Sequence, residues 1–321
     1  MGSLSLLTRR MPSMTRTLVI GATGNIGRQV VLHLAANDQP VRVLTRKSDG
    51  ACMPPQVEVV QGDLTSPESL DGCLGGIDAV FLVWTAPLAA FGPALERIAK
   101  HVRRIVFLSA PLKTPHPFFQ QPNPSRMQTE QIERMIETSA LDWTFLRPGM
   151  LASNSRHWWA RQILAGDVIR WPYLSVPTAP IDERDIAAVA VRVLCGDGHS
   201  GADYVLTGPQ SLTQFEQLST IGRVLGHTLS IQEISPEEAQ RELSATMPAF
   251  IVKMLLDAWS AAAGLPAFVT STVAEITGTP ARTFLDWATD HAADFEHARE
   301  TMASRSDPQP VNASAKYGQS L

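Results

Sequence analysis

A glycine-rich turn near the amino terminus constrains the fold of this chain more than any other feature of its sequence. Residues 17–21 (TLVIG) form a short apolar run that ends on a glycine, which is typical of a buried parallel strand. Residues 25–36 then place apolar side chains along one helical stripe. Between these two segments, Gly21, Gly24 and Gly27 form a G-x-x-G-x-x-G pattern. The order strand, glycine turn, helix predicts a dinucleotide-binding βα unit.

Each glycine has its own physical role in such a turn. Gly21 permits the tight turn, Gly24 lets the backbone approach a pyrophosphate, and Gly27 lets the helix pack closely on the strand. The helix N-terminus then offers unpaired N–H groups to the phosphates. A glycine turn without a ligand is the alternative. We expect cofactor contacts along the whole turn, from Gly21, Thr23, Gly24, Asn25, Ile26 and Gly27.

Apolar runs alternate with helical patterns through the first half of the chain. Strands are predicted at residues 17–21, 41–45, 57–61, 79–84, 104–109 and 143–147. Strands separated by helices in this way predict an α/β protein with a doubly wound, parallel Rossmann sheet. Beyond Pro148 helices and short strands follow, among them a strand at residues 202–208 (ADYVLTG). They predict a smaller C-terminal α/β part that covers the substrate.

The chain is therefore divided into four expected regions. They are an N-terminal extension (1–15), an NADP(H)-binding Rossmann domain (16–153), a substrate-binding part interleaved with it (154–297) and a polar tail expected to be disordered (298–321).

The composition narrows the range of partners. A net charge of -4 gives no electrostatic reason to expect nucleic acid or an anionic membrane. No apolar run approaches the ~20 residues of a membrane span. The three cysteines lie at wide spacings and the histidines show no ligand spacing, so neither a disulfide framework nor a metal site is expected. These features are typical of a cytoplasmic protein, expected as a monomer or homodimer.

The end of the second predicted strand bears on the choice of nicotinamide cofactor. An NAD site usually carries an acidic residue there for the ribose 2′-hydroxyl. This chain has Arg46 and Lys47 instead, which suit a 2′-phosphate because arginine can hold it with two hydrogen bonds. The alternative is that both cations only solvate a loop. The pattern favours NADP(H) over NAD(H).

Several motifs together resemble one known family. GATGNIG, VLTRKSD, DAVFLVW, SALDWTFLRPGMLASN and PIDERDIAAVAV are similar to the NmrA-like branch of the atypical short-chain dehydrogenase/reductases. Within this branch, the motifs are particularly similar to those of actinobacterial polyketide-tailoring ketoreductases. The family includes NADPH-dependent quinone and azo-type reductases, ketoreductases, isoflavone-type reductases and catalytically silent NADP(H) sensors. The resemblance therefore implies a cofactor-binding protein that is either a reductase or a sensor.

Carried over by position, the resemblance implies a site along the carboxyl ends of the strands. It places the adenine beside Asp63 and Leu64. It places the ribose and nicotinamide along Val83, Trp84 and Thr85, and along Pro148, Gly149 and Met150. It also places Ser109 at the catalytic serine position, and Asn154 in the substrate cleft. Ligands of open α/β sheets generally bind at this edge.

Residues 124–136 (PSRMQTEQIERMI) depart from the family's catalytic pattern. Orthodox members carry a Tyr and a Lys one helical turn apart here, and many NmrA-like relatives carry Lys or His four residues before a Glu. Alignment on Ser139 puts that Glu at Glu133 and the Lys/His position at Thr129. The usual proton donors are therefore missing.

Three other side chains are candidates for catalysis. Ser109 is best placed as a hydrogen-bond donor to substrate oxygen, and Thr129 could add a second hydroxyl unless it is a surface residue. His116, in a proline-rich loop, is the one histidine considered as a proton donor, against the favoured alternative of no role. Water or the substrate itself could also supply the proton.

Aromatic residues gather in the segments expected around the cleft. Trp158 and Trp159 are predicted to belong to a substrate wall and Tyr173 to a lid over the cleft, although packing in the core is an alternative for all three. Such walls favour a large, planar, apolar substrate. The resulting hypothesis is an NADPH-dependent reductase of an aromatic ketone or quinone, with a role in antibiotic tailoring. The alternatives are a silent NADP(H)-sensing regulatory protein and, less favoured, an isomerase or cyclase.

Overall fold

The computed structural model describes residues 15–46, 53–122, 124–166 and 168–296. The expected tail (298–321) and Lys47 lie outside the described residues, as does the expected N-terminal extension (1–15) except for its last residue. No helix in the described ranges is long and apolar enough to cross a membrane.

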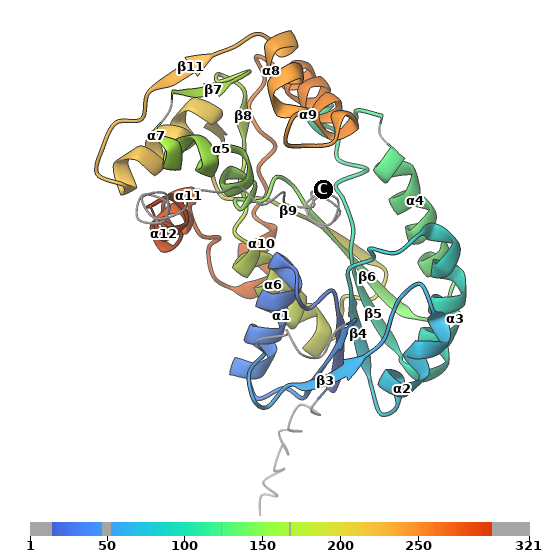
Figure 1. The fold of residues 1–321 in the computed structure, drawn as a ribbon. Helices are drawn as coiled ribbons and strands as arrows, with labels where there is room; N and C mark the ends of the chain where they lie inside the picture. The colour runs from blue at the N-terminus through green and yellow to red at the C-terminus, as the bar shows by residue number, and fades with distance from the viewer. Residues whose placement is uncertain (1–14, 47–52, 123, 167, 297–321) are drawn as a thin grey trace, which may run out of the picture.

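A parallel sheet of seven strands forms the centre of the molecule, in the order β3-β2-β1-β4-β5-β6-β9 (Figure 1). The order reverses between β1 and β4, so the predicted doubly wound Rossmann sheet is confirmed. The strands are β1 (Thr17–Ile20), β2 (Val41–Thr45), β3 (Glu58–Gln61), β4 (Ala79–Leu82), β5 (Arg104–Leu108), β6 (Asp142–Pro148) and β9 (Ala202–Leu206).

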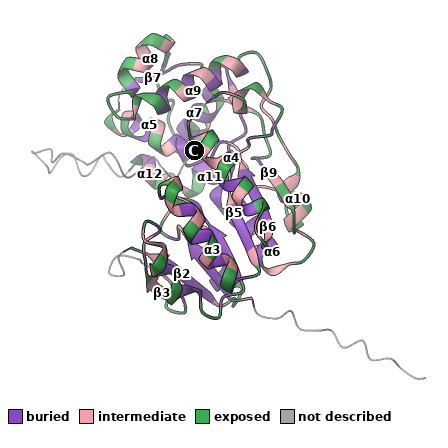
Figure 2. Ribbon diagram, turned by 90° about the vertical axis from the view of Figure 1, so that its right-hand side faces the viewer, coloured by how far each residue is buried: buried purple, intermediate pink, exposed green. Residues whose placement is uncertain are grey.

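Helices cover both faces of this sheet. On one face α1 (Asn25–Ala36) packs against α6 (Glu183–Cys195). The other face carries α2 (Asp71–Leu74), α3 (Phe91–His101) and α4 (Pro124–Glu137), as Figure 1 shows. The apolar stripe of α1 faces inward because its residues recur at helical spacing. Figure 2 shows the result, with buried strands between helices that turn their exposed residues outward.

The remaining elements form a smaller part at one end of the sheet (Figure 1). Its two short sheets pair β7 with β11 and β8 with β10. The elements of this part are α5 (Asn154–Ala165), β7 (Ile169–Trp171), β8 (Pro177–Thr178), β10 (Leu212–Thr213), α7 (Gln214–Val224), β11 (Ile231–Glu233), α8 (Pro236–Leu243), α9 (Ala249–Ala262), α11 (Phe284–Asp290) and α12 (Ala293–Glu296). Helix α10 (Thr272–Thr277) instead packs on α6 and β9 of the main sheet. Short 3₁₀ turns, η2 (Pro67–Leu70), η3 (Leu88–Ala90) and η4 (Pro117–Phe119), lie in the loops of the first half.

The two parts are interleaved along the chain. After α5 and β8 the chain returns to the main sheet, where α6 packs on α1 and β9 pairs in parallel with β6. It then leaves again for α7 to α9. The strand predicted at 202–208 therefore belongs to the main sheet, as its seventh strand, rather than to the smaller part.

Four tryptophans hold the smaller part together. Trp158 and Trp159 of α5 meet Trp171 of β7 and Trp259 of α9, with ring centroids between 5.6 and 5.8 Å apart. Three of the four are fully buried and Trp158 is partly buried. Their packing joins three elements that are distant in sequence, so this cluster is the core of the smaller part.

Loss of one of these rings should destabilise the protein strongly. Replacing Trp259 with Ala is expected to lower the free energy of unfolding by about 3–5 kcal/mol, because it opens a cavity between α9 and the other rings. Trp259→Phe should cost less, since the indole N–H has no hydrogen-bond partner and a ring is retained. Chemical denaturation of both variants measures the difference. Equal costs for Ala and Phe would contradict this account.

Candidate functional site

The glycine turn after β1 has no room for side chains. Gly21 has a φ of +90°, and a Cβ there would lie 2.7 Å from the Cβ of Val83 on the neighbouring strand segment. A Cβ at Gly27 would lie 2.1 Å from the carbonyl oxygen of Gly21. Helix α1 thus rests directly on the turn, as a dinucleotide-binding βα unit requires.

The N-terminus of α1 is open to an anion. Gly24 is its N-cap, no side chain caps the helix, and no acidic residue lies in its first turn. The first N–H groups of a helix have no intrahelical partners, and the helix dipole favours negative charge there. Together with the glycine cradle, these groups fit the pyrophosphate of a dinucleotide.

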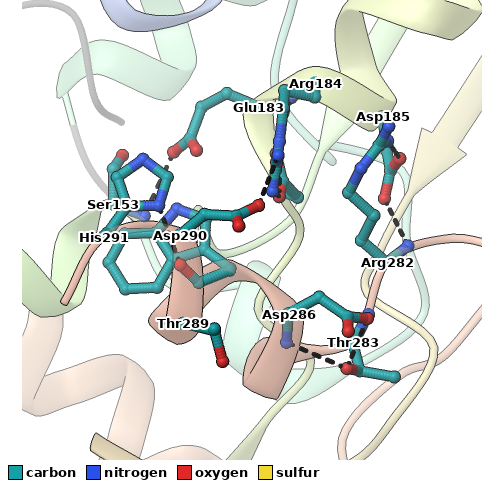
Figure 3. A network of polar contacts seen from close by, with 12 residues as sticks. Ser153, Glu183, Arg184, Asp185, Arg282, Thr283, Asp286, Thr289, Asp290 and His291 are labelled. Atoms are coloured by element: carbon teal, nitrogen blue, oxygen red, sulfur yellow. Dashed lines mark hydrogen bonds and ion pairs between the residues drawn. The ribbon is translucent and has the colours of Figure 1, made fainter. Parts of the chain in front are cut away.

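A partly buried hydrogen-bond chain joins the first residue of α1 to α5 and α6. The Asn25 side-chain amide donates to the Ser153 hydroxyl at 3.4 Å, and the Ser153 backbone N–H donates to a Glu183 carboxylate oxygen at 3.1 Å. Figure 3 shows Glu183 reaching Ser153 from the start of α6. Burial of Glu183 raises the pKa of its carboxyl. The chain links α1, α5 and α6 beneath the cofactor site.

Ion pairs fix α6 to the C-terminal helices (Figure 3). Arg184 pairs with its neighbour Asp182 at 2.5 Å and with Asp290 of α11 at 2.6 Å. Asp185 pairs with Arg282, whose backbone N–H also donates to it. Helix α6, which packs on α1, is therefore also held by ion pairs to Arg282 and Asp290.

The adenine end is less enclosed. Arg46 follows β2 with its side chain exposed, and its carbonyl accepts a hydrogen bond from Gln61. Hydrogen bonds from the backbone and hydroxyl of Thr65 lower the pKa of Asp63, so this carboxylate stabilises its own turn. Leu64 is buried against the sheet. Their contact with an adenine remains a prediction.

A cavity of about 690 Å³ runs along the carboxyl ends of β4, β5 and β6. Ile26 of the glycine turn lines one side, and the segments predicted to border the nicotinamide line its floor. Ser109, Thr129 and Asn154 lie in the same lining. The lining thus includes these predicted site residues: Ile26, Val83, Trp84, Thr85, Ser109, Thr129, Pro148, Gly149, Met150 and Asn154.

Helix α9 forms a wall of this cavity that sequence reasoning did not single out. Phe250, Ile251 and Met254 line the cavity, while Val252 and Trp259 face the tryptophan core. One helix therefore serves both surfaces. A run with apolar residues on more than one face is a signal for such a position, since a helix on the surface of a protein is usually apolar on one side only.

Ser109 is held by a buried ion pair at the cavity edge. Its hydroxyl donates to Glu133 Oε1 at 2.5 Å, and Arg147 donates from Nη2 to Glu133 Oε2 at 3.0 Å. The carboxylate is 3% exposed and the arginine 1% exposed. Burial raises the pKa of Glu133, against the hydrogen bond from Ser109 and the positive charges of Arg147 and Lys113, which lower it.

Sequence reasoning did not identify Arg147 as a site residue. The signal was available in the strand DWTFLRP, where an arginine stands among apolar residues of a buried strand. A cation in such a place needs a buried acidic partner. Glu133 on the facing helix is that partner, and Asp203 of β9 meets the arginine from its more exposed side at 3.2 Å.

The structure gives His116 a structural position. Its Nδ1 accepts from the Phe118 backbone N–H at 3.3 Å, which caps η4, so the other nitrogen, Nε2, carries the hydrogen and donates to the Pro266 carbonyl at 3.0 Å. Both ring nitrogens are occupied within the protein. The ring is therefore not free to give a proton to a substrate, and we no longer assign it that role.

Trp158, Trp159 and Tyr173 do not line the cavity. The two tryptophans belong to the aromatic core behind α9, so the predicted substrate wall is replaced there by α9 itself. Tyr173 has a φ of +53° in a turn whose carbonyl accepts from Gln214 and Val176. These aromatics have a packing role, the alternative that the sequence left open.

Among the residues that the structure describes, no group of three or more His, Cys, Asp or Glu side chains is arranged to hold a metal ion.

Comparison with known proteins identifies the family. A family model described as NAD(P)H-binding matches residues 21–195. The (4-alkanoyl-5-oxo-2,5-dihydrofuran-3-yl)methyl phosphate reductase of Streptomyces griseus is 37% identical over 288 residues, covering 87% of this chain and 98% of that protein. The NAD(P)H azoreductase of Xenophilus azovorans is 31% identical over 288 residues, with the same coverage. The chain belongs to the NAD(P)H-binding family, and its NmrA-like resemblance is confirmed.

Solved structures share the fold. The NADPH-dependent quinone oxidoreductase QOR2 of Escherichia coli superposes with a TM-score of 0.71 at 22% identity, over 85% of this chain and 98% of that one. The triphenylmethane reductase of Citrobacter sp., solved with NADP(H), gives a TM-score of 0.70 at 21% identity, over 86% and 99%. These likenesses agree with the Rossmann sheet described above.

The close contact beneath the turn predicts a clear effect on cofactor binding. Gly27→Ala should weaken NADPH binding at least about tenfold, because a methyl group 2.1 Å from the Gly21 carbonyl pushes α1 away from the turn. Gly72→Ala is the matched control, since a Cβ there meets no atom within 4 Å. Titration of NADPH fluorescence measures both dissociation constants. Similar values for the two variants would contradict the role given to Gly27.

Proposed function

We propose that this member of the NAD(P)H-binding family is an NADPH-dependent reductase of a large, planar, apolar carbonyl or quinone compound. The single observation that carries the proposal is the cavity of about 690 Å³, which extends from the glycine turn past the expected nicotinamide position to an apolar wall on α9. A site that only bound a cofactor would not need the part of the cavity that reaches α9. Its size is that of a typical small-molecule site.

The residues present fit a nicotinamide dinucleotide. Gly21, Gly24 and Gly27 with the α1 N-terminus would hold the pyrophosphate, and Pro148 to Met150 would lie along the nicotinamide. The reduced cofactor supplies hydride when bound. The chain orients the acceptor against it and excludes water with η4 and α9.

The lining of the cavity supports a neutral, aromatic substrate. Trp84, Phe119 and Phe250 provide flat apolar surfaces. Arg126 also lines the cavity, but its guanidinium donates to the carbonyls of Leu112 and Phe119 and pairs with a glutamate of its own helix. Among the described residues that line the cavity, Arg126 is the only cation, and these partners already occupy its guanidinium, so the lining does not favour a phosphate such as that named in the Streptomyces griseus enzyme's substrate. Polycyclic ketones and quinones, as modified in antibiotic tailoring, match these walls.

A silent NADP(H) sensor is the alternative function. The observation that favours it is the absence of the Tyr–Lys pair from α4, where Thr129 occupies the position used by many relatives for Lys or His. Ser109 and Thr129 nevertheless both line the cavity, with their side chains beside the expected nicotinamide. The extent of the cavity and these two residues support the reductase over the sensor.

A direct assay separates the two functions. Purified protein with NADPH is expected to reduce at least one member of a panel of polycyclic ketones and quinones, followed by loss of NADPH absorbance and by product analysis. Tight cofactor binding with no turnover of any panel member, and a co-purifying protein partner, would favour the sensor instead.

The cation after β2 predicts a preference between cofactors. Arg46→Ala should raise the dissociation constant of NADPH about tenfold and leave that of NADH unchanged, because only NADPH carries the 2′-phosphate that the guanidinium can bind. The control is Arg103→Ala, because Arg103 is an exposed arginine just before β5, at the end of that strand away from the cavity. Calorimetric titration with both cofactors measures the difference, and an equal change for NADH would exclude this role.

A further inference from the structure

We propose that Glu133, acting through the Ser109 hydroxyl, supplies the proton that completes carbonyl reduction. The inference rests on the proposed reductase function and concerns the same cavity. It assigns a proton route to a site that lacks the tyrosine and lysine on which orthodox relatives depend. Neither residue acts alone, because the carboxyl is buried behind the serine and the serine is not itself a strong acid.

The geometry provides a continuous path from the carboxyl to the cavity. Ser109 follows β5 and lines the cavity, so its oxygen can meet a substrate oxygen there. Glu133, one helical turn after Thr129 on α4, is 2.5 Å from the serine oxygen. This is the short distance typical of a hydroxyl bonded to a carboxylate. When Glu133 is protonated the bond is reversed: its Oε1–H donates to the Ser109 oxygen, and the serine hydroxyl donates to the substrate oxygen. Ser109 is thus the link between the buried acid and the cavity.

Arg147 makes the loss of the proton tolerable. Its Nη2 lies 3.0 Å from Glu133 Oε2, the oxygen that does not touch the serine. After the proton leaves, the carboxylate is paired with a buried cation instead of standing alone in a region of low polarity. The second ion pair of Arg147, to Asp203, holds the guanidinium in place from β9.

The charges around Glu133 oppose each other. Burial favours the neutral acid, and the neighbouring carboxylate of Glu137 acts in the same direction. Arg147 and Lys113 favour the carboxylate, as does the hydrogen bond from Ser109. The balance leaves the pKa of Glu133 above its usual range. The acid therefore stays protonated to higher pH than an exposed glutamate, which suits a proton donor.

The step balances in atoms and charge. The carbonyl carbon gains the hydride that reduced nicotinamide supplies, and the carbonyl oxygen forms an O–H bond with the proton of Ser109. The serine O–H bond breaks and is remade with the proton of Glu133. The product is an alcohol, and Glu133 remains as a carboxylate paired with Arg147. After the product leaves, water in the cavity returns a proton along the same path.

The direction in which kcat changes with pH follows from the order of these proton transfers. Glu133 must be protonated before the step, so kcat should be constant at low pH and fall as the pH rises through the raised pKa of this group. Glu133→Gln should abolish this limb of the pH profile. It should also lower kcat for a neutral ketone or quinone about 100-fold. The dissociation constant of NADPH should stay within about twofold, because Glu133 does not line the cavity.

Two further variants separate transfer from packing. Ser109→Ala keeps the Glu133–Arg147 pair but breaks the path, so it should lower kcat to a similar degree. Glu96→Gln removes an exposed carboxylate of α3 that is not among the charges acting on Glu133, and should stay within about twofold of the wild type. Thermal unfolding and circular dichroism show whether each variant is folded.

A cationic triphenylmethane dye provides a substrate control. Such a dye becomes neutral when it accepts hydride, so its reduction requires no proton. Glu133→Gln and Ser109→Ala should therefore reduce the dye at rates near the wild type while losing ketone or quinone reduction. Equal losses with both substrates, or no loss with either, would overturn the relay.

Infrared spectroscopy tests the acid without turnover. In a pH titration, the cofactor-free wild type should keep the carbonyl band of a protonated carboxylic acid to higher pH than its exposed carboxyl groups do, and this late-titrating band should be missing from Glu133→Gln. Absence of that difference would overturn the proposal even in an active enzyme. A wild type that shows the band but reduces no substrate would instead contradict the proposed function.

Discussion

The reversal of strand order between β1 and β4 is the constraint on which the rest of the molecule depends. Because these strands lie side by side, the turns that follow them leave in opposite directions and open a crevice at the carboxyl edge of the sheet. Gly21 sits in this crevice against Val83, so the close approach of the two turns is itself part of the cradle. The segments after β5 and β6 extend the same edge toward the smaller part, and the cavity follows from their alignment.

The interaction between Glu133 and Arg147 sets two electrostatic effects against each other. A buried ion pair such as Glu133–Arg147 brings little net stability, because desolvation of both charges offsets their attraction. Apolar residues of similar size could fill the same space with equal stability. An acid in this position instead gives Ser109 a partner and a fixed orientation at the cavity edge. The pair is therefore better explained by the orientation of Ser109 than by a contribution to the stability of the fold.

The sequence was sufficient for six of the seven strands of the main sheet and for the glycine turn because their signals are local. Each of these six strands contains a short apolar run, and the turn is a contiguous motif. The seventh strand, β9, has a strand pattern as well, but its place beside β6 depends on the path of the chain through the smaller part. The contacts of Arg147 depend on three elements that meet only in the folded chain. The same is true of Trp158 and Trp159: their sequence shows large aromatic surfaces, but only the packing of α5 against α9 decides whether those surfaces face a ligand or each other.

The two-sided character of α9 has an evolutionary consequence. Phe250 and Met254 face the cavity one helical turn apart, whereas Val252, Leu256 and Trp259 form the opposite seam with the tryptophan core. Substitutions on the first seam can reshape the binding surface without opening a void in the second. Related chains can thus diversify in substrate range on a conserved scaffold, since adaptation at one side of the helix leaves the stability margin on the other side intact.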